Sequence, residues 1–96
     1  MEVFYLLKQR TKCDKSDSQI RKDIYSMLDE DYNACIRVYD AKQALLAIKR
    51  VIRMNTLENA LKILMNSYTY YEADLFYKAF LEKYINILWG ELYGKN

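Results

Sequence analysis

The sequence contains no histidine and no proline, and its only two glycines are Gly90 and Gly94. An all-β fold needs turn residues at regular intervals, so the scarcity of glycine and proline favours helices. Without histidine, the chain lacks the usual general base near neutral pH and the commonest metal ligand. These absences predict an all-α protein that is not an enzyme.

Cysteine is also scarce, and no long apolar run is present. Cys13 and Cys35 match no zinc or redox spacing, which favours free thiols in a reducing compartment. The first ten residues lack the pattern of a signal peptide, and no window approaches the ~20 apolar residues of a membrane span. We therefore expect a cytoplasmic protein that binds no membrane, located in a host cell if its origin is viral.

The composition points to association with other macromolecules. Ninety-six residues predict one helical domain, 1–96. Hydrophobic residues make up 52% of it and include ten tyrosines, more apolar surface than a small monomer readily buries. The weight of lysine, isoleucine, tyrosine and asparagine is typical of small accessory proteins of viruses and plasmids with AT-rich genomes. A homodimer with a further macromolecular partner is the expected assembly.

Helix start signals and apolar spacing predict about four helices. Ser16 and Gln19 have the spacing of a capping box before a helix over 17–28. Thr56 precedes an apolar face that predicts a helix over 56–66, and Thr69 with Glu72 repeats the capping-box spacing before a helix over 70–93. Residues 1–10 form a short apolar run that periodicity assigns neither to strand nor to helix.

The segment over 33–54 has two interpretations. One is a single helix over 33–54, preceded by a break at Asp29-Glu30-Asp31. Its heptad-like apolar row would be Ala34, Val38, Ala41, Leu45, Ile48 and Ile52. The other places strand-forming residues at 35–39, followed by a fresh helix that starts near Asp40.

The predicted helix over 70–93 is apolar around nearly all of its circumference, which is typical of a buried helix. In so small a domain, such burial requires a second chain. We therefore predict an all-α bundle of about four helices, completed by dimerisation. The candidate dimer interface consists of Phe76, Phe80, Tyr84, Leu88 and Trp89.

No catalytic, metal-binding or cofactor site can be assembled from these residues. Asp29-Glu30-Asp31 offers oxygen ligands of the type that Mg²⁺ prefers, but adjacent residues point in different directions and no partner motif is present. Asp40-Ala41-Lys42 matches a fragment of a metal-nuclease motif that would need strand geometry and further ligands. We expect neither a cofactor nor a metal ion.

Positive charge is concentrated in two segments. Residues 8–22 hold six bases and two acids, and residues 42–53 hold four bases and no acid. Such clusters neutralise phosphates in nucleic-acid binding, although they also occur as solvated faces and at helix C-termini. The candidate nucleic-acid contacts are Lys8, Arg10, Lys12, Arg21, Lys22, Lys49, Arg50 and Arg53.

Two function classes remain. The leading hypothesis is a non-enzymatic helical module that acts through protein–protein interaction, because a net charge of +2 is small for a dedicated nucleic-acid binder. The partner would meet the surfaces of the helices over 17–28 and 33–54. The alternative is a small dimeric DNA-binding regulator that resembles a helix-turn-helix protein and uses the segments 8–22 and 42–53.

Overall fold

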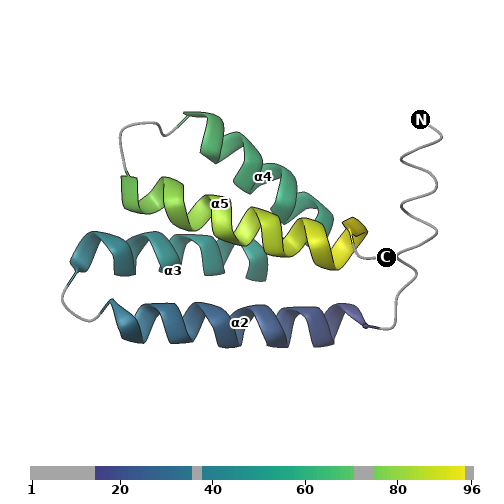
Figure 1. Cartoon of the computed structure of the whole chain (residues 1–96). Coiled ribbons are helices and arrows are strands. Elements are labelled where there is room, and N and C mark those ends of the chain that lie inside the picture. Colours follow the sequence, from purple (N-terminus) through teal and green to yellow (C-terminus); the bar gives the residue numbers. More distant parts are fainter. Residues whose placement is uncertain (1–14, 36–37, 71–74, 95–96) are drawn as a thin grey trace.

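The chain forms a bundle of α-helices in the computed structural model, which describes residues 15–35, 38–70 and 75–94. These residues form the helices α2 (Asp17–Ala34), α3 (Tyr39–Arg53), α4 (Leu57–Tyr70) and α5 (Leu75–Trp89), and then the π-helical turn η1 (Gly90–Gly94) (Figure 1). No strand occurs among them. The prediction of an all-α bundle of about four helices is confirmed, whereas the apolar run at 1–10 lies outside the described residues.

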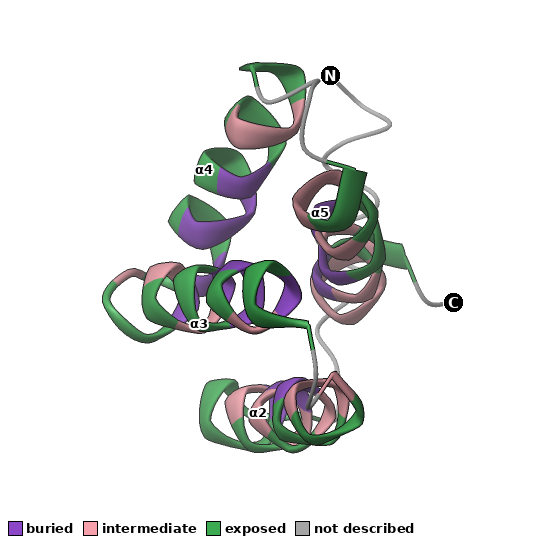
Figure 2. Ribbon diagram, turned by 90° about the vertical axis from the view of Figure 1, so that its left-hand side faces the viewer, coloured by how far each residue is buried: buried purple, intermediate pink, exposed green. Residues whose placement is uncertain are grey.

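Helix α3 is the central element of the bundle. It packs against α2, α4 and α5, and α4 and α5 also pack against each other. In Figure 2, α2 lies below α3, and α4 and α5 lie above and beside it, with the buried positions of all four helices turned toward a common interior. One side of α3 is therefore covered by three helices.

The core is built from most of the apolar rows that the sequence predicts, but Ala34 and Val38 of the predicted row over 33–54 are exposed. Its members recur three or four residues apart, which places them on one face of each helix. They are Ile20, Ile24, Leu28, Leu45, Ile48, Ile52, Leu57, Ala60, Leu61, Leu64, Leu81, Tyr84 and Leu88. Ala41 and Ala44 are also buried on α3. Small side chains at these two positions let the neighbouring helices approach closely.

Two predicted helix starts are confirmed by their capping bonds. The backbone N–H of Gln19 donates to Ser16 Oγ at 3.1 Å, and that of Asn59 donates to Thr56 Oγ1 at 3.1 Å. Each bond satisfies one of the N–H groups that the first turn of a helix leaves without a partner. The Gln19 side chain bonds Asp23 at 2.9 Å, so the reciprocal half of the capping box is absent.

The predicted break at Asp29-Glu30-Asp31 is wrong, because α2 runs through these residues to Ala34. Tyr32 and Cys35 continue the apolar face one and two turns after Leu28 and pack against the core. The single helix predicted over 33–54 is also wrong, because Ala34 belongs to the end of α2 and a separate helix follows. The alternative start near Asp40 is close to the observed one, since α3 begins at Tyr39. Residues 36–37 lie outside the described part of the chain.

The boundary between the last two helices also differs from the prediction. Thr69, expected at a helix start, lies in the last turn of α4, where its hydroxyl donates to the carbonyl of Met65 at 3.2 Å. Threonine side chains form local bonds to the backbone both at caps and inside helices, so the sequence position of Thr69 does not by itself distinguish the two. Helix α5 begins at Leu75, and residues 71–74 are outside the described ranges.

Arg21 ties the start of α2 to the end of α3. Its guanidinium donates to Asp17 Oδ1 at 2.6 Å, to the carbonyl of Ile52 at 2.6 Å and to the carbonyl of Asn55 at 2.7 Å. The last carbonyls of a helix have no partner within the helix. Arg21 therefore serves as the cap of α3 from another helix, and its charge is engaged within the chain.

Replacing Arg21 with methionine should lower the free energy of unfolding by roughly 2–3 kcal/mol, because two carbonyls lose a charged donor. Chemical denaturation monitored by circular dichroism measures this difference. The matched control is Lys22→Met on the exposed side of α2, which should change stability by less than about 0.5 kcal/mol. Equal effects from the two substitutions would contradict the capping role.

Candidate interaction surface on α3

The outer side of α3 carries a second regular row of residues, opposite the buried row. Its members recur at steps of four, three, four and three, and Met54 follows directly at the end of the helix. We call this row the outer stripe; it consists of Tyr39, Gln43, Leu46, Arg50, Arg53 and Met54, and all of them are exposed. Both sides of α3 therefore have heptad-like spacing, but only one is buried within the chain.

Three members of the outer stripe are large apolar side chains in contact with solvent. Tyr39 is 73% exposed, Leu46 is 44% exposed and Met54 is 69% exposed. The sequence analysis did not predict them, because the four bases and no acid of residues 42–53 are the more prominent feature of this segment. The signal was present, since Tyr39 and Leu46 lie one heptad apart on the side of α3 that faces away from the buried row.

Arg50 and Arg53 are the charged members of the outer stripe. Both were predicted as binding residues, and both are exposed. Within residues 15–35, 38–70 and 75–94, neither forms an ion pair. They lie in the last turn of α3, where positive charge is favourable against the helix dipole. The guanidinium groups are therefore tolerated there and remain available to a partner.

Among the described residues, the other predicted nucleic-acid contacts do not join Arg50 and Arg53. Lys8, Arg10 and Lys12 lie outside the described residues. Arg21 caps α3, and Lys22 stands on the exposed side of α2. Lys49 bonds Asp29 Oδ1 at 3.2 Å and lies 5.6 Å from the centre of the Tyr25 ring. Of the eight predicted residues, Arg50 and Arg53 therefore remain: they share one face of α3, and neither forms an ion pair with another described residue.

Lysines of the bundle repeatedly lie over tyrosine rings. Besides Lys49 on Tyr25, this arrangement joins Lys42 to Tyr32, Lys78 to Tyr68 and Lys83 to Tyr84, with nitrogen-to-centroid distances of 5.1, 4.7 and 5.5 Å. A cation over an aromatic face is attracted by the ring's electron density. Much of the lysine charge is thus directed at side chains of the same chain.

A hollow of about 130 Å³ lies beside the outer stripe, between α2 and α3. It is lined by Leu28, Asp29, Tyr32, Leu45, Leu46 and Lys49. Leu46 belongs both to this hollow and to the outer stripe, so the two features form one continuous surface. The Lys49–Asp29 ion pair stands at its edge.

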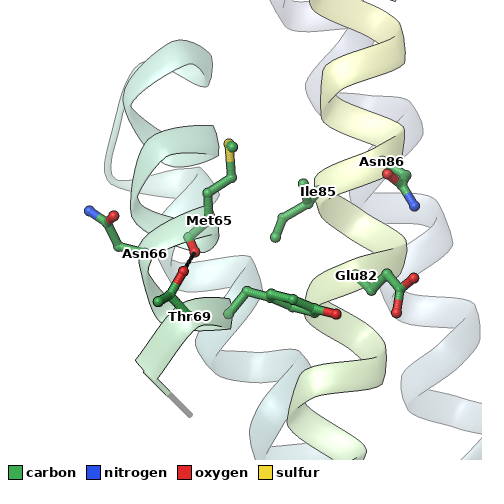
Figure 3. Close-up of a pocket in the computed structure, with 7 residues that line it drawn as sticks. Met65, Asn66, Thr69, Glu82, Ile85 and Asn86 are labelled. Atoms are coloured by element: carbon green, nitrogen blue, oxygen red, sulfur yellow. Dashed lines mark hydrogen bonds between the residues drawn. The ribbon is translucent and has the colours of Figure 1, made fainter. Parts of the chain in front are cut away.

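A second, open cleft of about 400 Å³ separates α4 from α5. Figure 3 shows Ile85 on α5 pointing toward Met65 on α4, whereas the side chains of Glu82 and Asn86 point away from α4. Met65 and Ile85 are the apolar residues of the cleft lining, and Glu82 contributes the carboxylate. No buried, unpartnered polar atom points into it from the described residues.

The five residues predicted as a dimer interface do not share one surface. Tyr84 and Leu88 are fully buried in the core of the single chain, and Phe80 is partly buried against it. Phe76 is 50% exposed and Trp89 is 41% exposed. Phe76 and Trp89 lie thirteen positions apart on α5, which separates their directions by about 140° around the helix axis at ~100° per residue. A flat interface on α5 therefore contains one of the two.

The acidic cluster 29–31 is divided among partners on different helices. Asp31 Oδ2 accepts hydrogen bonds from Lys83 Nζ at 2.7 Å and from the hydroxyl of Tyr84 at 2.6 Å. Partial burial alone would raise the pKa of Asp31, but these two donors outweigh it and hold the pKa below its usual value. Burial, and then the bond to Asp31, raises the pKa of Tyr84. These bonds join α2 to α5.

Two further observations concern the described residues only. No group of three or more potential metal ligands occurs among them. None of their helices is both long enough and apolar enough to cross a membrane.

Comparison of the chain with protein-family models, with curated proteins and with solved structures found no match. The class of protein is therefore given by the fold, a small all-α bundle.

Replacing Asp31 with asparagine should destabilise the protein by about 1–2 kcal/mol at pH 7, because Lys83 and Tyr84 lose a charged acceptor. A carboxyl group whose pKa is lower in the folded state stabilises the fold above its unfolded pKa of about 3.9. That contribution disappears as the pH falls through the folded pKa. The wild type should thus lose more stability than Asp31→Asn on acidification.

Urea denaturation from pH 7 to pH 3 tests this expectation. The control is Glu82→Gln, which removes an exposed carboxyl, leaves the bonds of Asp31 in place and should change stability at pH 7 by less than about 0.5 kcal/mol. Parallel curves for the wild type and Asp31→Asn would show that the network does not contribute to the acid sensitivity.

Proposed function

We propose that the chain is a non-enzymatic association module that binds a protein partner through the outer stripe of α3. The observation that carries the proposal is the interleaving of Tyr39, Leu46 and Met54 with Arg50 and Arg53 on one exposed side of a helix. Tyrosine, methionine and arginine are enriched in the centres of protein interfaces, and lysine and acids are depleted there. Tyrosine and arginine also dominate binding energies.

The alternative function is a small dimeric DNA-binding regulator. Arg50 and Arg53 favour it, since both are exposed and form no ion pair within the described ranges. The arrangement of α2 and α3 favours it less. These helices run side by side in opposite directions (Figure 1), whereas the two helices of a helix-turn-helix meet at about 90–120°. Contacts to DNA phosphates would also leave the exposed apolar side chains Tyr39, Leu46 and Met54 without a role.

The proposal includes the assembly and the setting expected from the composition. A homodimer would cover apolar residues of α5, with Trp89 as its exposed aromatic side chain. The free thiol of Cys35 is consistent with a reducing cytoplasm, either of the organism itself or of a host cell. A small accessory protein of a virus or plasmid would fit this combination.

Association through the outer stripe is tested with two variants, Leu46→Asp and the pair Arg50→Glu with Arg53→Glu. Each should reduce partner capture from the cells that naturally produce the protein by at least about tenfold, because a central interface residue contributes about 2 kcal/mol or more. Quantitative pull-down with immobilised protein measures the loss. The control is Lys62→Glu on α4, exposed and outside the stripe, which should capture partner normally.

Binding of duplex DNA at low salt separates the two functions. If DNA binds, and binding weakens steeply with salt and depends on Arg50 and Arg53, the regulator is correct. Equal partner capture by the wild type and Leu46→Asp would contradict the association surface.

Light scattering should give about twice the chain mass of 11.5 kDa for the wild type. Trp89→Asp should restore the mass of one chain, since a buried charge at an apolar contact is costly. Circular dichroism must show that the variant keeps its helices. Met54→Asp, on α3, is the control and should remain dimeric. A wild type that stays monomeric at millimolar concentration would rule out the homodimer.

A further inference from the structure

We propose that the partner element that docks on the outer stripe is an acidic amphipathic helix lying along α3. This inference rests on the proposed association function and adds the chemistry of the partner. It follows from three properties of the surface, which are its spacing, the hollow beside it and the sign of its free charges.

The spacing of the outer stripe suits a helix. Steps of four and three residues form a straight row along one side of α3, which is the pattern that packs against a second helix at about 20°. From Tyr39 to Met54 the row extends about 22 Å at ~1.5 Å per residue. A partner helix of about four turns would cover it. An extended strand would find no free sheet edge on this surface.

The hollow between α2 and α3 gives the partner helix a fixed position. Leu46, at the middle of the stripe, is also part of the lining of the hollow, and the partly buried Tyr32 adds apolar surface beside the core residues Leu28 and Leu45. An apolar side chain that projects from the partner would remove this surface from water. The partner helix therefore needs at least one large apolar residue near its centre.

The exposed charges of the outer stripe determine which charge the partner helix must carry. The stripe holds two arginines and no acid, and the nearest acid of the hollow, Asp29, is paired with Lys49. The planar guanidinium matches a carboxylate in a bidentate way and is less strongly hydrated than an ammonium group. Arg50 and Arg53 lie one helical turn apart, so they would meet carboxylates three or four positions apart on the partner.

The experiment uses a displayed library of helical peptides, randomised along one side of a fixed helical scaffold. Peptides are selected for binding to the wild-type chain and against both Leu46→Asp and Met54→Asp. Two counter-selected variants are used so that misfolding of one does not decide the result. We expect the surviving peptides to be enriched in Asp and Glu beside an apolar row.

Their affinity should fall at least tenfold for the pair Arg50→Glu with Arg53→Glu, and exchange of the peptide acids for lysine should restore binding to this variant. Lys62→Glu should bind like the wild type. Stripe-dependent peptides without acid enrichment would overturn the acidic helix and leave the association function standing. If no peptide distinguishes the wild type from both aspartate variants, the association surface itself is refuted. If duplex DNA binds through Arg50 and Arg53 and no helical peptide binds, both the acidic-helix proposal and the protein-association function are wrong, and the DNA-binding function takes their place.

Discussion

The burial of one side of α3 by three other helices constrains the rest of the bundle. Helices α2, α4 and α5 all pack against this side, so its residues must be apolar, and some must be small. Ala41, Ala44, Leu45, Ile48 and Ile52 meet this requirement and are buried. The same constraint exposes the opposite side of α3, because no described helix remains to cover it. The exposed outer stripe is thus a consequence of the packing.

Residues that sequence reasoning placed correctly depend on local chemistry or on periodicity. Ser16 and Thr56 cap the helices they were expected to cap, since a capping bond involves residues three positions apart. The buried rows follow from spacing alone. The break expected at Asp29-Glu30-Asp31 failed for the opposite reason. Asp29 and Asp31 are stabilised within α2 by Lys49 on α3 and Lys83 on α5, partners that no local pattern reveals.

The candidate site was predicted in part. Arg50 and Arg53 could be named from the acid-free segment 42–53, but the structure was needed to separate them from Arg21 and Lys49, whose charges serve the fold. The apolar half of the surface was missed because Leu46 and Tyr39 become significant when the other side of α3 is known to be buried. A count of basic residues does not distinguish a cation that lies over a tyrosine ring from one that faces solvent.

The sole tryptophan of the chain has a further consequence. Trp89 ends α5, and its ring meets that of Tyr93 edge to face, with centroids 5.2 Å apart and planes inclined by 60°. Trp89 is 41% exposed and lies on a different helix from the outer stripe. The intrinsic fluorescence of the protein is therefore a local reporter of the junction between α5 and η1. A second chain that covered the indole would shift its emission to the blue.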